Sequence, residues 1–273
     1  MNPTKNNTSP LIFTIFGATG DLTKRKLIPA MFKLFSQGRL PDGFAIIAIG
    51  RRDKSRREFR DEMRDFMTGN LGKEVDDALW ENFKEKIIYF KMNFLEDGGY
   101  VLLNGLSVEI DKDLGTKGNR IYYLATAPGF FEVIIQKLHS NGMLDNRESW
   151  QRVMIEKPFG SDLRTATELN ENITKLISED RIFRIDHYLG KEMIQNILSL
   201  RFGNSIFEPL WNHNYIDHIQ IISTETLGVG SRGGYYDDTG IIKDMLQNHI
   251  LQMLTLIAME PPVNLKAESI RDE

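Results

Sequence analysis

Short apolar runs alternate with longer, charged, helix-like stretches over the first two thirds of the chain. The apolar runs are Leu11–Phe16, Phe44–Ile49, Ile87–Phe94, Arg120–Thr126 and Arg152–Ile155. Runs with so few charges are typical of parallel strands that are covered on both faces. Strands that alternate with helices predict an α/β domain with a doubly wound parallel sheet, over roughly residues 10 to 186.

The pattern changes after about residue 190. Glu192–Leu200 has the period of a helix, His218–Thr224 is a strand candidate, and Ile241–Met259 indicates one long helix that ends before Pro261. Two helices and one strand do not complete a domain. We therefore expect a second domain that is incomplete within this chain, with the domains at residues 1–188 and 189–273.

Composition excludes several classes of function. The chain has no cysteine, which rules out disulfides, thiolate catalysis and cysteine-ligated metals. A net charge of −4 argues against a dedicated nucleic-acid binder. The polar start has no signal-peptide pattern, and the first apolar run is too short to span a bilayer. We expect a cytoplasmic protein that binds neither nucleic acid nor membrane.

A glycine-bearing turn joins the first apolar run to the first helix, in the segment Gly17-Ala-Thr-Gly20-Asp-Leu22. Glycine permits a tight turn and a close approach to a pyrophosphate, which the helix N-terminus also attracts. The middle glycine of the G-x-G-x-x-G pattern is replaced by Thr19, so an ordinary strand–helix turn is the alternative. In its context the turn predicts a Rossmann-type dinucleotide site. The predicted contacts are Gly17, Thr19, Gly20, Asp21 and Leu22.

The end of the second apolar run indicates which dinucleotide binds. An NAD site places an acidic residue there, whereas this chain has Gly50 followed by Arg51 and Arg52. Guanidinium groups suit a 2′-phosphate. We predict NADP as the cofactor, with Arg51 as its contact; the alternative is a solvated, basic helix start.

Polar residues also occur close together in three segments, at positions where burial in a hydrophobic core would be unfavourable. Glu156-Lys-Pro-Phe-Gly160 follows the fifth strand, and Arg184 to Lys191 contains an acid, an imidazole, a phenol and an ammonium within six positions. Asp244 and His249 lie five residues apart, about 140° around an α-helix, so they do not share a face, although they could still flank one ligand at the helix edge. Asp186 and His187 can instead be a strand-end pair that satisfies backbone groups, and His249 a core histidine.

Four stretches together resemble the motifs of glucose-6-phosphate dehydrogenases, in that family's order: GATGDLTKRKL, EKPFG, RIDHYLGKE and RGGYYDDTGIIKDMLQNHILQ. The resemblance runs from about Leu11 to Pro262. It implies oxidation of glucose 6-phosphate at C1 to 6-phosphogluconolactone, with hydride transfer to NADP, the first step of the pentose phosphate pathway. It also implies that the Rossmann domain is followed by an α+β substrate and dimerisation domain with a mostly antiparallel sheet. Homo-oligomers are expected of the full-length family, but are doubtful for this chain.

The resemblance also implies residue roles. His249 corresponds to the general base, and Asp186 to the carboxylate that orients it. The remaining matches bind substrate or coenzyme. They are His187, Tyr188 and Lys191 for the substrate phosphate, Lys157, Glu225 and Asp244 for sugar hydroxyls, Lys26 for the substrate, and Lys157 and Thr126 beside the coenzyme. No metal is required.

Two other functions fit parts of the sequence. Inositol or glucose–fructose oxidoreductases share a Rossmann domain and a Glu-Lys-Pro motif, but the run from Asp186 to Lys191 favours a phosphorylated substrate. A non-catalytic fragment that holds NADP or a sugar phosphate is the second alternative.

Overall fold

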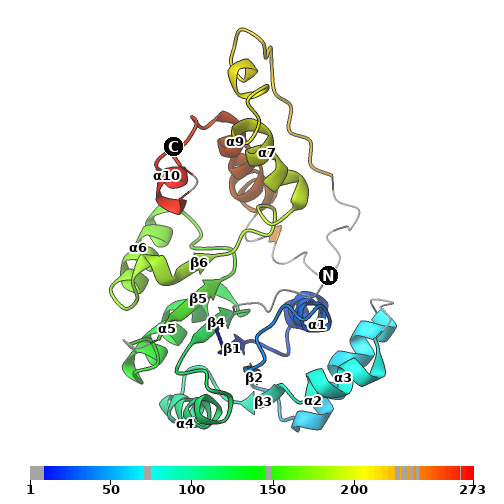
Figure 1. Ribbon diagram of the computed structural model, residues 1–273. Coiled ribbons are helices and arrows are strands. Elements are labelled where there is room, and N and C mark those ends of the chain that lie inside the picture. The colour runs from blue at the N-terminus through cyan, green and yellow to red at the C-terminus, as the bar shows by residue number, and fades with distance from the viewer. Residues whose placement is uncertain are drawn as a thin grey trace. The chain divides into compact units, whose positions relative to one another are not determined.

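The computed structural model describes residues 9–70, 75–145, 149–224, 228, 233, 236–237, 240–264 and 266–273. The chain divides into two compact units, Met1–Ile185 (unit 1) and Asp186–Glu273 (unit 2), whose elements are labelled in Figure 1.

Unit 1 is built on a six-stranded sheet. Its strands are β1 (Leu11–Phe16), β2 (Phe44–Gly50), β3 (Ile87–Lys91), β4 (Arg120–Leu124), β5 (Gln151–Ile155) and β6 (Ile182–Arg184). All neighbours are parallel, in the order β3-β2-β1-β4-β5-β6. The order reverses between β1 and β4, which is the arrangement of dinucleotide-binding doubly wound sheets. The predicted Rossmann fold is confirmed, and the five predicted strands are all present.

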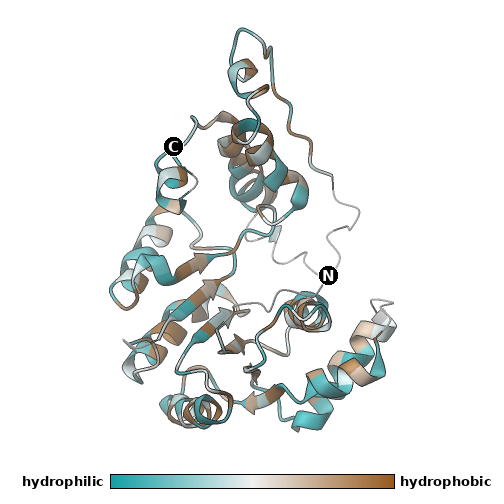
Figure 2. Cartoon of the chain, viewed as in Figure 1, coloured by the Kyte–Doolittle hydropathy of each residue, from teal (hydrophilic) through white to brown (hydrophobic). Residues whose placement is uncertain are grey.

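Helices supply the apolar cover that these strands need. They are a π-helix (Thr23–Leu27) that continues into α1 (Ile28–Ser36), α2 (Arg56–Asp65) with a π-helical end (Phe66–Asn70), α3 (Asp77–Lys84), α4 (Asp97–Leu114), α5 (Phe131–Ser140) and α6 (Leu163–Thr174), with 3-10 turns at Pro128–Phe130 and Glu179–Arg181. Two clusters of buried side chains result. One includes Phe16, Tyr100 and Phe131, and the other includes Phe44 and Trp80. In Figure 2 the helices carry both hydrophobic and hydrophilic segments, as amphipathic cover requires.

The charged, amphipathic pattern of residues 52–66 predicts a helix from Arg52, but the helix begins later, at Arg56. Ser55 is its N-cap, because its hydroxyl accepts from the Glu58 amide while the Glu58 carboxylate accepts from the Ser55 amide. This capping box satisfies two amides that would otherwise lack partners. Residues 51–54 are consequently a turn between β2 and α2.

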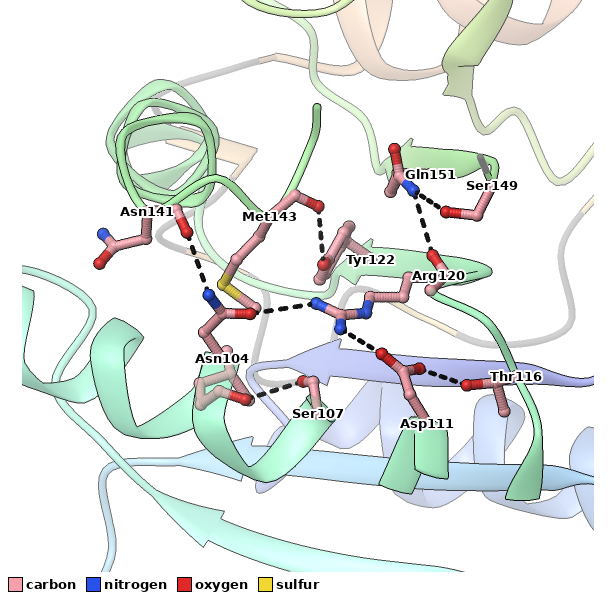
Figure 3. Close-up of polar contacts among 12 residues, drawn as sticks. Asn104, Ser107, Asp111, Thr116, Arg120, Tyr122, Asn141, Met143, Ser149 and Gln151 are labelled. Carbon is pink, nitrogen blue, oxygen red and sulfur yellow. Dashed lines mark hydrogen bonds and ion pairs between the residues drawn. The ribbon is translucent and has the colours of Figure 1, made fainter. Parts of the chain in front are cut away.

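A buried ion pair ties α4 to the amino-terminal end of β4 (Figure 3). Arg120, which is 6% exposed, places Nη2 2.7 Å from Oδ2 of Asp111, and Asp111 also accepts from the Thr116 hydroxyl. The Gln151 side chain donates to the carbonyl of Gly118 at 3.1 Å. These contacts lie at the sheet edge opposite the carboxyl ends of the strands, where ligands bind in such folds.

Unit 2 is helical in the residues that the structure describes. It contains α7 (Glu192–Phe202), a 3-10 turn (Glu208–Leu210), a π-helix (Ile242–Ile250) that continues into α9 (Leu251–Ala258), and α10 (Ala267–Asp272). Tyr188, Ile194 and Met253 form its buried core. The guanidinium of Arg201 donates to the carbonyls of Leu256 and Met259 at the end of α9.

Two details of unit 2 differ from the sequence-based expectation. The predicted helix 241–259 is continuous, but its first half has π-helical hydrogen bonding. The predicted strand His218–Thr224 lies outside helices but in no ladder, because a strand is defined by hydrogen bonds to a partner and none is present among the described residues of unit 2. In the part of the chain that the structure describes, no helix is long and apolar enough to cross a membrane.

Candidate active site

The turn after β1 is held tightly by backbone contacts. Gly17 has a φ of 86°, and a Cβ there would overlap the carbonyl oxygen of Ala125. The amides of Gly17 and Ala18 donate to the Ile49 carbonyl at 3.1 and 2.8 Å, and the Gly20 amide donates to Gly17 at 2.9 Å. Glycine at position 17 is thus required by both φ and space. A helix starts directly after this turn, as a pyrophosphate site needs.

The other predicted residues of this turn have distinct surroundings. The methyl carbon of Thr19 lies 2.9 Å from where a Cβ on Gly50 would stand, so Gly50 makes room for Thr19. The exposed carboxylate of Asp21 forms an ion pair with Arg25 at 2.7 Å. The remaining predicted positions in this part of unit 1 are Leu22 and Thr126, both half-buried, and Lys26, which is exposed.

Arg51 and Arg52 are exposed in the turn between β2 and α2, next to the carboxyl end of β2. Their neighbours are constrained. The hydroxyl of Tyr89 donates to the carbonyl of Arg52 at 2.7 Å, and Lys54 forms an ion pair with Glu62. The turn therefore carries two guanidinium groups at the sheet edge where ligands bind.

Lys157 follows β5, also at the carboxyl end of the sheet, and is half-buried. Its peptide bond to Pro158 is cis. The preceding carboxylate, Glu156, accepts a hydrogen bond from the hydroxyl of Tyr123. Burial raises the pKa of Tyr123, and the hydrogen bond to Glu156 raises it further, so the phenol remains a donor.

In unit 2, Asp186 and His249 form a hydrogen-bonded pair although they are 63 residues apart in sequence. Oδ1 of Asp186 lies 2.8 Å from Nδ1 of His249 and also accepts from the Tyr188 amide at 2.9 Å. The His249 ring is fully buried, and the Asp186 side chain is 17% exposed. A proton on Nδ1 that is directed at a carboxylate leaves Nε2 to accept another, as in Asp–His pairs of other enzymes.

The π-helix changes the predicted relation between Asp244 and His249. Both side chains are buried, at 2% and 0% exposure, and the Asp244 carboxylate accepts from the hydroxyl of Tyr236 at 2.9 Å. The expectation that they lie on different faces was wrong because it assumed α-helical spacing. The i→i+5 hydrogen bonds of a π-helix place residues five apart about one turn apart.

Aromatic rings surround the imidazole of His249. The Tyr188 ring stacks on it with centroids 4.1 Å apart and an interplanar angle of 14°, and the His187 ring meets it edge-on at 4.8 Å. Nζ of Lys191 lies 3.4 Å from the centroid of Tyr188. His187 and Lys191 are exposed, whereas Tyr188 is buried and its hydroxyl contacts that of Ser223 at 3.1 Å. Sequence reasoning did not reveal this stack, because no periodicity signals ring contacts between distant segments.

Glu225, the remaining predicted substrate contact, lies outside the described residues. Ligand atoms of Asp186, His187 and His249 lie within 4.8 Å of one another, a spacing that a metal ion could also bridge. The predicted absence of a metal requirement stays a prediction.

The two units together have the features of a dinucleotide-binding protein of the dehydrogenase class. Unit 1 supplies the reversed strand order, the glycine turn and the basic turn, and unit 2 supplies the Asp–His pair. Comparison with known families agrees. The family model "Glucose-6-phosphate dehydrogenase, NAD binding domain" matches residues 14–196, and "Glucose-6-phosphate dehydrogenase, C-terminal domain" matches residues 198–273. The chain belongs to the glucose-6-phosphate dehydrogenase family.

Individual relatives show the extent of the match. The chain is 44% identical over 278 residues to glucose-6-phosphate 1-dehydrogenase of Chlamydia muridarum, covering 100% of this chain and 55% of the relative. The enzyme of the same name from Bacillus subtilis is 44% identical over 270 residues, covering 98% and 54%. A solved structure of a glucose-6-phosphate dehydrogenase in complex with glucose-6-phosphate has a TM-score of 0.88 at 42% identity, covering 97% of this chain and 54% of that one. The chain spans about half the length of the curated relatives it matches.

Proposed function

We propose that the protein oxidises glucose 6-phosphate at C1 to 6-phosphogluconolactone with NADP⁺ as the hydride acceptor, the first step of the pentose phosphate pathway. The observation that carries this proposal is the buried Asp186–His249 pair, with 2.8 Å between Oδ1 and Nδ1. Family membership supports the substrate, since relatives at 44% identity bear the name of that activity.

The proposed proton acceptor is Nε2 of His249. The O–H bond of the C1 hydroxyl breaks, its proton moves to Nε2, and its electrons form the carbonyl of the lactone. Asp186 stabilises the imidazolium that results, because its carboxylate accepts from Nδ1. The chemistry that NADP⁺ supplies when bound is acceptance of the hydride from C1.

The donor set of unit 1 fits this coenzyme. The glycine turn before the first helix suits a pyrophosphate, and the exposed guanidinium of Arg51 suits the 2′-phosphate. Several contacts remain proposals. They are those of Gly17, Thr19, Gly20, Asp21, Leu22, Arg51, Thr126 and Lys157 with the coenzyme, of Lys157, Glu225 and Asp244 with sugar hydroxyls, of Lys26 with the substrate, and of His187, Tyr188 and Lys191 with its phosphate.

The exposed side chains of His187 and Lys191, beside the Asp–His pair, support a phosphorylated substrate. His187 and Lys191 offer hydrogen-bond donors to a phosphate dianion, which an unphosphorylated sugar would not need. A cytoplasmic location and a homo-oligomer of the full-length family are also proposed, on the sequence pattern and the family resemblance respectively.

The test is absorbance at 340 nm with NADP⁺, comparing glucose 6-phosphate with glucose. We expect turnover with the phosphate ester only, and a loss of about 10²- to 10⁴-fold in His249→Ala with substrate affinity retained. His213→Ala, at a position that is exposed in the same unit, is the matched control. Turnover with glucose alone would contradict the proposal.

A non-catalytic fragment is the second candidate, because the chain spans about half the length of its relatives. It predicts calorimetric binding of NADP⁺ or of glucose 6-phosphate without turnover.

A further inference from the structure

The turn between β2 and α2 is held from two neighbouring elements. On β3, the Tyr89 hydroxyl donates to the carbonyl of Arg52 at 2.7 Å, and Nζ of Lys91 lies 3.0 Å from Oδ2 of Asp53. On α2, Glu62 forms an ion pair with Lys54. A loop of four residues with contacts to two elements has little conformational freedom left.

The Tyr89 hydroxyl lies directly over the end of β2. A Cβ on Gly50 would stand 2.7 Å from this oxygen and 2.9 Å from the methyl carbon of Thr19. Phe59 of α2 stacks on the Tyr89 ring, with centroids 5.0 Å apart and 25° between the planes. The Tyr89 side chain thus lies between α2 and the glycine turn that follows β1. Burial raises the pKa of Tyr89 above its usual value of 10, so the hydroxyl keeps the proton that it donates.

Most charged side chains in and around this turn form ion pairs with one another. Glu62 forms ion pairs with both Lys54 and Lys24, and Asp53 forms one with Lys91. Among the described residues, no ion pair involves Arg51 or Arg52, and both are exposed. The guanidinium groups of this turn are therefore the ones left to meet an anion.

We propose that Tyr89 is a positioning residue for the choice between NADP and NAD. Its hydroxyl fixes the backbone carbonyl of Arg52 by a hydrogen bond. The neighbouring residue Arg51 thereby keeps a backbone orientation that directs its side chain towards the 2′-phosphate. This inference rests on the proposed NADP function. A long guanidinium side chain contributes to specificity only when its backbone is held in place. NAD has no 2′-phosphate, so its affinity does not depend on this contact.

The test is calorimetric titration of the 273-residue chain with NADP⁺ and with NAD⁺. Tyr89→Phe removes the hydroxyl and keeps the ring against Phe59. We expect its Kd for NADP⁺ to rise about fivefold, on the scale of one hydrogen bond. Its Kd for NAD⁺ should stay within about twofold.

Tyr122→Phe is the matched control. Tyr122 is also buried, and its hydroxyl donates to a backbone carbonyl, that of Met143, at 3.1 Å. Its loss should change neither Kd. If Tyr122→Phe weakens NADP⁺ as much as Tyr89→Phe does, the effect is general loosening and the inference is wrong.

A double-mutant cycle distinguishes an effect of Tyr89 that acts through Arg51 from a general effect on the stability of the site. In an Arg51→Ala background, Tyr89→Phe should cause no further loss of NADP⁺ affinity. Additive losses, or equal losses for both coenzymes in Tyr89→Phe, overturn the inference and leave the proposed function standing. Equal losses for both coenzymes in Arg51→Ala instead contradict the assignment of NADP, and with it the inference.

Discussion

The ring of Tyr188 lies parallel to the imidazole of His249, 4.1 Å from it between centroids. The ammonium of Lys191 lies 3.4 Å from the same Tyr188 centroid. A ring at 4.1 Å leaves no space for the ammonium on that face, so Lys191 covers the opposite one. His249 is thus held by a stack on its ring face and by Asp186 at Nδ1.

Tyr188→Leu should therefore lower the rate of glucose 6-phosphate oxidation by about tenfold, because the base loses the surface that fixes its ring. Tyr188→Phe keeps the stack and should stay close to the wild-type rate. Proton NMR offers a readout without turnover, since ring protons of His249 should lose the ring-current shift that Tyr188 causes in the leucine variant only. A higher KM with unchanged kcat in Tyr188→Phe would instead indicate that the hydroxyl binds the substrate phosphate.

The carboxylate of Glu62 links the first helix of unit 1 to the turn before α2, through ion pairs with Lys24 and Lys54. Burial by itself raises the pKa of Glu62, but the hydrogen bonds from the two ammonium groups outweigh burial and hold it below 4.5. A lowered folded-state pKa stabilises the fold above about pH 4.5, and this contribution is lost as the pH falls through the folded value.

Glu62→Gln should accordingly lower the free energy of unfolding by about 1 kcal/mol at pH 7. The difference from wild type should shrink as the pH falls below 4.5 and through the lowered pKa of folded Glu62, because both proteins are uncharged at this position once that pKa is passed. Urea unfolding at pH 7 and at a pH below that pKa measures it. Glu168→Gln, in an exposed pair with Arg164, is the control with little expected change. A loss that is equal at both pH values would argue against the linkage.

The buried pair of Arg120 and Asp111 predicts a larger effect on stability. Asp111→Ala leaves the guanidinium buried without its counterion, which should cost about 3 to 5 kcal/mol in urea unfolding. The double variant Asp111→Leu with Arg120→Met should regain most of that loss, because no uncompensated charge remains. Asp61→Ala removes a charge from an exposed pair with Arg57 and should change stability little. Failure of the double variant to recover would indicate a packing role for the pair.

Two glycines predict opposite outcomes for the same substitution. At Gly17 the φ of 86° and the nearby Ala125 carbonyl exclude a Cβ, so Gly17→Ala should destabilise unit 1 by several kcal/mol and weaken binding of NADP⁺. Gly105 lies inside α4, where a Cβ would meet no other described part of the chain within 4 Å. Gly105→Ala should therefore stabilise unit 1 by about 0.5 to 1 kcal/mol. Thermal unfolding of both variants tests the pair, and a neutral Gly17→Ala would show that the turn can shift.

Much of unit 1 was predictable because its signals are local. A strand buried on both faces must be apolar at successive positions, and this property marked five strands and so the doubly wound sheet. The sixth strand, Ile182–Arg184, has three residues, too few for any periodicity to register. The charged pattern predicts α2 from Arg52, four residues before its start at Arg56, because the Ser55 cap and not the onset of charge sets where the helix begins.

The sequence by itself determined five of the six strands of unit 1, the glycine turn and the order of the four motifs, since these depend on neighbouring residues. Tertiary structure alone decided that Asp186 contacts His249 through Nδ1, that Asp244 and His249 are one π-helical turn apart, and that the Tyr89 hydroxyl holds the carbonyl of Arg52. These relationships join atoms 63 and 37 residues apart, or depend on which hydrogen-bond register a helix adopts. Helix packing and strand order set such distances, and a local pattern carries no information about them.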